Sequence, residues 1–114
     1  MLITLPKPPS VNSMYRHNGN HTYITPDGVA WRIRAGYALN AQYKKKTPLR
    51  GDLSVYVTLY ICGRGDIDNF NKGLLDLFTK HEVWEDDSQI VFLQLQKIKV
   101  KHRTDEKVEV EIDC

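Results

Sequence analysis

The chain has 114 residues, of which 41% are hydrophobic and 26% charged, and its formal net charge is +2. This length predicts one domain over residues 1–114, and the composition is that of an ordinary globular protein. No apolar run in the sequence approaches the roughly 20 residues of a membrane-spanning helix, and the N-terminus lacks the pattern of a secretory signal. We therefore expect a cytoplasmic protein without a membrane partner.

The first half of the chain predicts a strand, a hairpin and a helix. Residues 2–5 form a short apolar strand, and Asn18-Gly19 between two strand-like runs is a hairpin signal. Thr25 and Pro26 begin a helix, as a hydroxyl cap and a first-turn proline. Apolar residues at helical spacing extend this helix to about Lys46.

The second half predicts a helix among three strands. Residues 53–61 alternate between apolar and polar, which is typical of a half-buried strand. A second helix begins near Asp68 and ends near Lys80. A long strand then begins at Val91, and a slip in its apolar phase predicts a bulge near Gln96-Lys97.

The last strand, at residues 108–112, is expected to pair antiparallel with its predecessor across a turn at residues 104–106. The whole order predicts an α+β fold. We expect one mixed sheet with two main helices packed on it and an N-terminal hairpin.

Acidic residues cluster in two segments. Asp66 and Asp68 precede the second helix, and Glu85-Asp86-Asp87 follows it. Carboxylates at i and i+2 point to one side of an extended chain, and clustered carboxylates repel each other unless a cation compensates. Oxygen ligands without a cysteine or histidine set favour Mg²⁺. Two other interpretations stay open, because an aspartate before an apolar run often caps a helix and acidic loops are common.

Basic residues cluster where the first long helix is expected to end. Lys44, Lys45 and Lys46 are followed by Arg50. Such a cluster either complements the helix dipole or attracts the phosphates of a nucleic acid. The glycines near Gly63 lack the spacing of a nucleotide-binding loop, so no nucleotide cofactor is expected.

The acidic segments belong to a longer pattern. Asp66-Ile67-Asp68-Asn69 is followed by Lys72, by Leu75-Asp76 and by the segment 85–90, and the chain opens with a Pro-Lys-Pro-Pro-Ser segment and Tyr15-Arg16. In order and spacing this pattern resembles the RusA family of Holliday junction resolvases. The resemblance spans residues 6–90, and it is the combination of segments that makes it specific.

The resemblance implies an endodeoxyribonuclease that resolves four-way DNA junctions by paired symmetric nicks and leaves 5′-phosphates. It implies that Asp66, Asp68 and Asp87 bind Mg²⁺, for which Mn²⁺ is expected to substitute. Lys72 corresponds to the active-site lysine of the family. Asp86 corresponds to the neighbouring acid and is a further candidate ligand.

The resemblance also implies a homodimer, because a four-way junction has near two-fold symmetry and the family is dimeric. We expect basic residues to hold the junction arms through phosphate contacts with little reading of bases. The candidates are Arg16, Arg64, Lys44, Lys45 and Lys46. Family members are often encoded by prophages, so a prophage origin is expected for this chain.

Two other functions fit the same residues. A nuclease of this fold could prefer another branched or flapped DNA, and a DNA-binding module could have lost catalysis. The presence of all the matched acids argues against the second, because unpaired carboxylates do not help a protein to bind an anion.

Overall fold

The computed structural model describes residues 1–44, 47–64 and 70–114. The strands of its main sheet are β1 (Leu2–Leu5), β4 (Leu53–Ile61), β5 (Ile90–Lys99) and β6 (Lys107–Asp113). The hairpin consists of β2 (Tyr15–Asn18) and β3 (His21–Ile24). The helices are α1 (Val11–Met14), α2 (Pro26–Gln42) and α3 (Asn71–Lys80), with short 3₁₀ turns η2 (Asp87–Gln89) and η3 (Arg103–Asp105).

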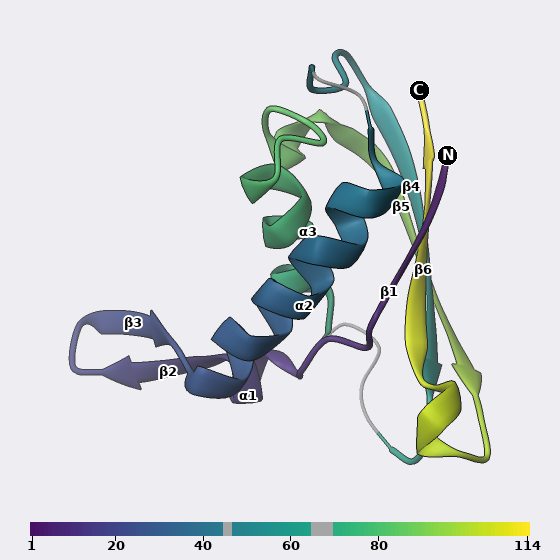
Figure 1. Ribbon diagram of the computed structural model, residues 1–114. Helices are drawn as coiled ribbons and strands as arrows, with labels where there is room; N and C mark the ends of the chain where they lie inside the picture. The colour runs from purple at the N-terminus through teal and green to yellow at the C-terminus, as the bar shows by residue number, and fades with distance from the viewer. Residues whose placement is uncertain (45–46, 65–69) are drawn as a thin grey trace.

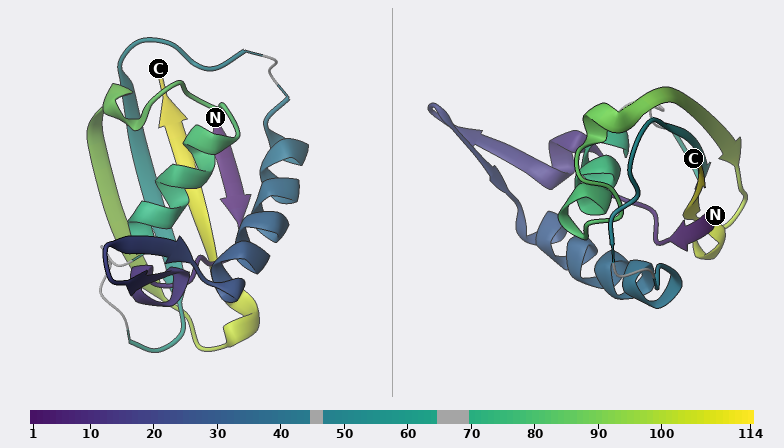
Figure 2. Two further views of the ribbon diagram at one scale, coloured as in Figure 1. Left: turned by 90° about the vertical axis from the view of Figure 1, so that its left-hand side faces the viewer. Right: turned by 90° about the horizontal axis from the view of Figure 1, so that it is seen from above.

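The main sheet has the strand order β1-β6-β4-β5. Helices α2 and α3 lie on one side of it, and the β2–β3 hairpin extends away from this body (Figure 1). Figure 2 shows both helices in front of the sheet, with α3 over β4 and β6. No helix in the described part of the chain is long and apolar enough to span a membrane.

The sheet is mixed, because β4 pairs in parallel with β5 and antiparallel with β6. This confirms the predicted α+β fold with two main helices and an N-terminal hairpin. The predicted pairing of the last two strands is wrong, since β4 lies between β5 and β6. The connection through α3 makes β5 parallel to β4, and β6 then pairs with the other side of β4.

The predicted bulge at Gln96-Lys97 is also wrong. The pairing of β4 with β5 is regular there, and its irregularity lies between Leu53 and Ser54 at the start of β4. β5 is an edge strand on which Val91 and Phe92 are exposed. Apolar residues of β5 therefore lie at exposed as well as half-buried positions, and a change in their alternation does not indicate a bulge.

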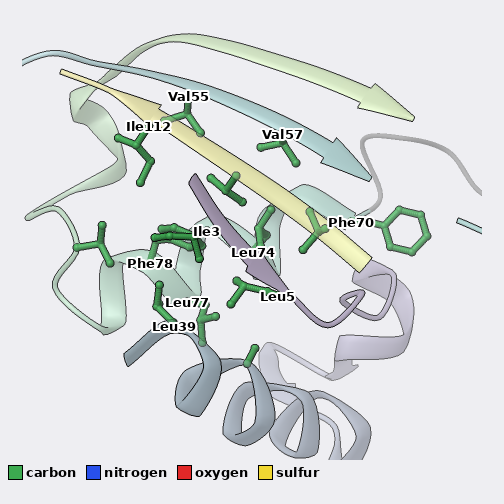
Figure 3. Close-up of a cluster of buried hydrophobic side chains, with 14 of the residues drawn as sticks. Ile3, Leu5, Leu39, Val55, Val57, Phe70, Leu74, Leu77, Phe78 and Ile112 are labelled. Carbon is green, nitrogen blue, oxygen red and sulfur yellow. The ribbon is translucent and has the colours of Figure 1, made fainter. Parts of the chain in front are cut away.

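The core fills the space between the sheet and the two long helices. Every second residue of β4, from Leu53 to Ile61, is buried. In Figure 3, Leu74, Leu77 and Phe78 of α3 gather over the inward-facing side chains of the sheet. Burial of each large apolar side chain stabilises the fold by about 1.5–3 kcal/mol, so this face fixes how α3 is rotated.

Helix α2 begins where the sequence predicted. The Thr25 hydroxyl accepts the Gly28 N–H at 3.1 Å and donates to the Ser13 carbonyl at 2.6 Å. The Thr25 N–H also donates to the Met14 carbonyl at 2.8 Å. One capping residue therefore joins the start of α2 to the end of α1.

The same helix ends at Gln42, earlier than the predicted end near Lys46, which lies outside the described residues. The Gln42 side chain accepts the Thr4 N–H at 2.8 Å and donates to the Thr4 carbonyl at 2.7 Å. These bonds satisfy the backbone of β1, and Tyr43 then adopts an extended conformation and packs against the core.

The segment before the hairpin contains a helix that the sequence did not predict. Ser10 caps the single turn α1, which ends with the buried side chain of Met14. The hairpin that follows confirms the prediction at Asn18-Gly19, where Gly19 has a φ of +62°. A glycine suits this left-handed conformation because it has no Cβ.

Helix α3 begins at Asn71, later than the predicted start near Asp68, and ends at Lys80 as predicted. Phe70 occupies the capping position and offers no side-chain hydrogen bond. Asp66 and Asp68 lie outside the described residues.

Two glycines of α2 give a matched test of this packing. A Cβ on Gly28 would lie 2.8 Å from the Met14 backbone oxygen, whereas one on Gly36 would lie 2.9 Å from the tip of the His81 side chain. We expect Gly28→Ala to lower the free energy of unfolding by about 1–3 kcal/mol. Gly36→Ala should change it by less than about 1 kcal/mol, because the imidazole can move and alanine favours the helix.

Urea unfolding of both variants measures these changes. Equal effects at the two positions would contradict the close approach of α1 to α2.

Candidate active site

Two charged side chains of the family pattern lie on the face of α3 that does not enter the core. Because Leu74, Leu77 and Phe78 point into the core, Lys72 and Asp76, which are one turn apart, lie on another face. The parallel pairing places the end of β4 and the start of β5 at opposite ends of the strand pair. Helix α3 therefore connects the segment after β4 with the segment before β5.

Three elements meet at Tyr15. Its hydroxyl donates to Asp76 of α3 at 2.9 Å and accepts from the Arg32 guanidinium of α2 at 3.2 Å. The Lys72 ammonium nitrogen lies 4.9 Å from the centroid of the Tyr15 ring. The pKa of Tyr15 is raised, first by burial and then by the hydrogen bond to Asp76, so its hydroxyl stays a donor.

The acidic segment before β5 is held rigidly. The Asp86 carboxylate accepts the Ser88 N–H at 3.1 Å, and the Gln89 side chain accepts the Glu85 N–H at 2.8 Å and the Asp86 N–H at 3.0 Å. Gln89 also donates to the carbonyls of Leu49 and Gly51. The segment is exposed, as expected for an ordinary acidic loop, but these hydrogen bonds fix its backbone.

Trp84 anchors the same segment from inside. Its side chain is fully buried, stacks on Phe78 with ring centroids 5.2 Å apart, and donates to the Thr79 hydroxyl at 2.7 Å. It is therefore a core residue and cannot stack on a base.

The carboxylates of this region crowd one another. A hydrogen bond from the Ser88 backbone lowers the pKa of Asp86. The pKa of Asp87 is raised by its interaction with the Asp86 side chain, by burial, and by the negative charge of Asp86 and of Asp76. Asp76 of α3 is thus an electrostatic neighbour of Asp87, and a cation would relieve the repulsion.

A polar hollow lies beside Lys72. Its volume is about 260 Å³, and it is lined by α1, the hairpin and α3. The lining residues include Arg16, whose guanidinium donates to the Asn12 carbonyl, together with Lys72 and His17. Two cationic side chains around a hollow of this kind suit a phosphate group.

Only part of the predicted site lies among the described residues. Lys72 is near the hollow that Arg16 lines, and Asp87 is near Asp76. Arg64, after β4, and Lys44, after α2, are exposed, and neither lines this hollow. Four further predicted residues lie outside the described residues: Asp66, Asp68, Lys45 and Lys46. Within residues 1–44, 47–64 and 70–114, no three His, Cys, Asp or Glu side chains form a group that could hold a metal.

Sequence reasoning missed the roles of three residues that the structure brings together. Asp76 and Tyr15 were noticed only as parts of the family pattern, although the spacing of Lys72 and Asp76 already predicts a shared helix face. Arg32 gave no signal, because its contact with Tyr15 depends on how α2 packs.

Comparison with known proteins identifies the family. The family model described as Endodeoxyribonuclease RusA matches residues 6–113. The chain belongs to the RusA family. Its relatives include proteins named crossover junction endodeoxyribonuclease RusA, from Escherichia coli strain K12 at 36% identity and from Enterobacteria phage 82 at 38% identity. Each alignment covers 86% of this chain and 82% of the relative.

A third relative of the same name, from Shigella sonnei strain Ss046, is 34% identical over 99 residues. The predicted resemblance to RusA is confirmed, and with it the assignment to a family of endodeoxyribonucleases. A phage relative also accords with the expected prophage connection.

Charge crowding in this RusA-family chain gives a stability prediction. In EDTA at neutral pH, Asp87→Asn should raise the midpoint of thermal unfolding, because a neutral amide is not repelled by Asp86 and Asp76. The pKa of Asp87 is raised in the fold, so the ionised carboxylate destabilises the protein above that pKa. The gain should therefore shrink as the pH falls through the raised pKa and the wild-type carboxyl takes up a proton.

Asp52→Asn, at an exposed carboxylate before β4, is the control and should shift the midpoint less. A lower midpoint for Asp87→Asn at neutral pH would contradict the crowding.

Proposed function

We propose that this chain is a Mg²⁺-dependent endodeoxyribonuclease that resolves four-way DNA junctions. The observation that carries the proposal is the match to the RusA family over residues 6–113, together with a rigid acidic segment beside α3. The relatives that share this match are named for cleavage of crossover junctions. The domain spans residues 1–114 in this proposal.

Asp66, Asp68 and Asp87 are the proposed metal ligands. The direction of the Asp87 pKa supports this role, because contact with the Asp86 side chain, burial, and the charges of Asp86 and Asp76 raise that pKa, and a bound cation would favour the ionised carboxylate. Asp86 is a weaker candidate, since its carboxylate already accepts the Ser88 N–H. Oxygen ligands of this type suit Mg²⁺, and Mn²⁺ is expected to replace it.

When bound, the ion supplies Lewis acidity at the scissile phosphate and lowers the pKa of an attacking water. The protein contributes the fixed geometry around it. Gln89 and Trp84 hold the backbone on either side of Asp86 and Asp87, so Asp87 loses little freedom when it takes part in binding. Such pre-organisation favours catalysis.

Lys72 is the proposed cation for the reacting phosphate. Its ammonium donates only, so it stabilises negative charge that develops on the phosphate oxygens. As the water oxygen bonds to phosphorus, the bond from phosphorus to the sugar 3′ oxygen breaks and that oxygen takes up a proton, which leaves a 5′-phosphate on the other fragment. Arg16 would bind a backbone phosphate across the same hollow.

The remaining basic residues are proposed to hold the junction arms. Arg64 and Lys44 are exposed, and Lys45 and Lys46 continue the same basic cluster in the sequence. Contacts of this kind recognise the DNA backbone rather than its bases.

A homodimer is part of the proposal. A four-way junction offers two equivalent strands across a near two-fold axis, and a C₂ dimer would present one site to each. Family membership supports this arrangement, and one active site in one chain could not make two symmetric nicks at once.

The central test is a nicking assay on a synthetic four-way junction. Wild-type protein should cut with Mg²⁺ or Mn²⁺ and stop when EDTA is added. Asp66→Asn, Asp68→Asn and Asp87→Asn should bind the junction but not cut it. Lys72→Ala should slow cutting by about 10²–10³-fold, whereas Asp52→Asn should cut like wild type.

A supercoiled plasmid that extrudes a cruciform tests the paired nicks in the same experiment. A dimer should convert it directly to linear DNA, and independent monomers would accumulate nicked circles. Faster cutting of flaps or Y-forms than of the four-way junction would favour the other branched substrates. Binding without cutting in either metal would favour the DNA-binding module.

A further inference from the structure

Lys72 has an obvious ion-pair partner that it does not use. Asp76 lies one helical turn beyond it on α3, and opposite charges at this spacing normally attract each other. Yet the described residues show no ion pair between Lys72 and Asp76. The exposed ammonium of Lys72 instead lies over the Tyr15 ring, 4.9 Å from its centroid.

Tyr15 accounts for this arrangement. Its hydroxyl donates to the Asp76 carboxylate at 2.9 Å, while its ring offers Lys72 a negative π face. Arg32 donates to the same hydroxyl at 3.2 Å and lies 5.9 Å from the ring, so the orientation of the tyrosine is fixed from α2. Tyr15 therefore contacts both Lys72 and Asp76, the two residues that could otherwise form an ion pair.

The place of Tyr15 in the chain adds to its importance. It is the residue at which α1 ends and the β2–β3 hairpin begins. It also lines the hollow that holds Arg16 and Lys72. The contact thus links the hairpin to the face of α3 on which Lys72 lies.

We propose that Tyr15 is a positioning residue that keeps Lys72 from pairing with Asp76, so that the ammonium donors remain available to the substrate phosphate. If Lys72 formed an ion pair with Asp76, its ammonium would donate to that carboxylate instead of facing the hollow. The inference rests on the proposed function, because it assigns Lys72 to phosphate.

Tyr15→Phe is the test variant, since it keeps the ring and removes the hydroxyl. Released from its hydrogen bond, Asp76 should attract Lys72. The single-turnover rate on saturating four-way junction should fall by about 10–100-fold. The dissociation constant of the junction, measured in Ca²⁺ or EDTA, should change by less than about threefold in the same variant, because the ion pair affects the reacting phosphate rather than the binding of the junction arms.

The same substitution is then made in the Asp76→Asn variant, in which an amide replaces the carboxylate and cannot form an ion pair with Lys72. In that background, Tyr15→Phe should change the rate by less than about threefold, since the two residues act as one unit. A fall in both backgrounds, whether from misfolding or from another role of the hydroxyl, would overturn the proposal. An unchanged rate for Tyr15→Phe alone would overturn it as well.

Tyr60 is a matched control on β4. The Glu109 carboxylate interacts with its hydroxyl and raises the pKa of Tyr60, and the Lys107 ammonium lies 4.8 Å from its ring centroid. It alternates with the buried residues of β4 and so points to the outer side of the sheet. Tyr60→Phe should leave the rate unchanged.

The NMR signals of the Lys72 side chain provide a readout that needs no cleavage. The Tyr15 ring should shift the signals of the Lys72 ε-methylene upfield. This shift should be lost in Tyr15→Phe and retained in Tyr15→Phe/Asp76→Asn. If the wild type shows these NMR shifts but does not cut the junction, the proposed nuclease function is contradicted and the contact of Tyr15 with Lys72 is not. If the wild type cuts the junction but lacks the shifts, only the proposed contact is contradicted.

Discussion

The burial of one face of α3 is the constraint on which the rest of the molecule depends. Leu74, Leu77 and Phe78 must lie against the sheet, and their spacing leaves no freedom in the rotation of the helix. Lys72 and Asp76 therefore lie on the face that meets Tyr15 and Arg32. The same burial sets the end of α3, from which the chain passes through Trp84 to the acidic segment. Hydrophobic packing thus determines where the charged groups lie.

The charged groups themselves work against the fold. The contact with the Asp86 side chain, burial, and the negative charges of Asp86 and Asp76 all raise the pKa of Asp87, so its ionised form is disfavoured in the fold. A sequence selected for stability alone would not keep these acids together. Their rigid support by Gln89 and Trp84 indicates that the crowding is maintained by the structure. This is the pattern expected where acids serve a bound cation.

Much of the fold was predictable from the sequence, because its signals are local. The alternation in residues 53–61, the capping residue Thr25 and Asn18-Gly19 each determine a nearby backbone conformation. The pairing of β6 was not predictable in this way. It depends on a parallel crossover through α3, and the apolar pattern of an edge strand such as β5 carries little information about register.

The candidate site also has a part that the sequence predicts and a part that only tertiary packing creates. The acids and Lys72 could be named from the sequence pattern and from the RusA resemblance, which the comparison confirmed. The contact of Tyr15 with Asp76 joins residues 61 positions apart, and Arg32 reaches the same hydroxyl from a third element. Such contacts follow from tertiary packing, so only the structure could reveal them.

The account depends most directly on one ion shared by two acidic segments. Anomalous diffraction from crystals grown with Mn²⁺ would locate that ion. The account predicts a peak bounded by the carboxylates of Asp87 and of Asp66 or Asp68. A peak that Asp87 does not contact, or Mn²⁺ bound only elsewhere on the protein, would contradict it.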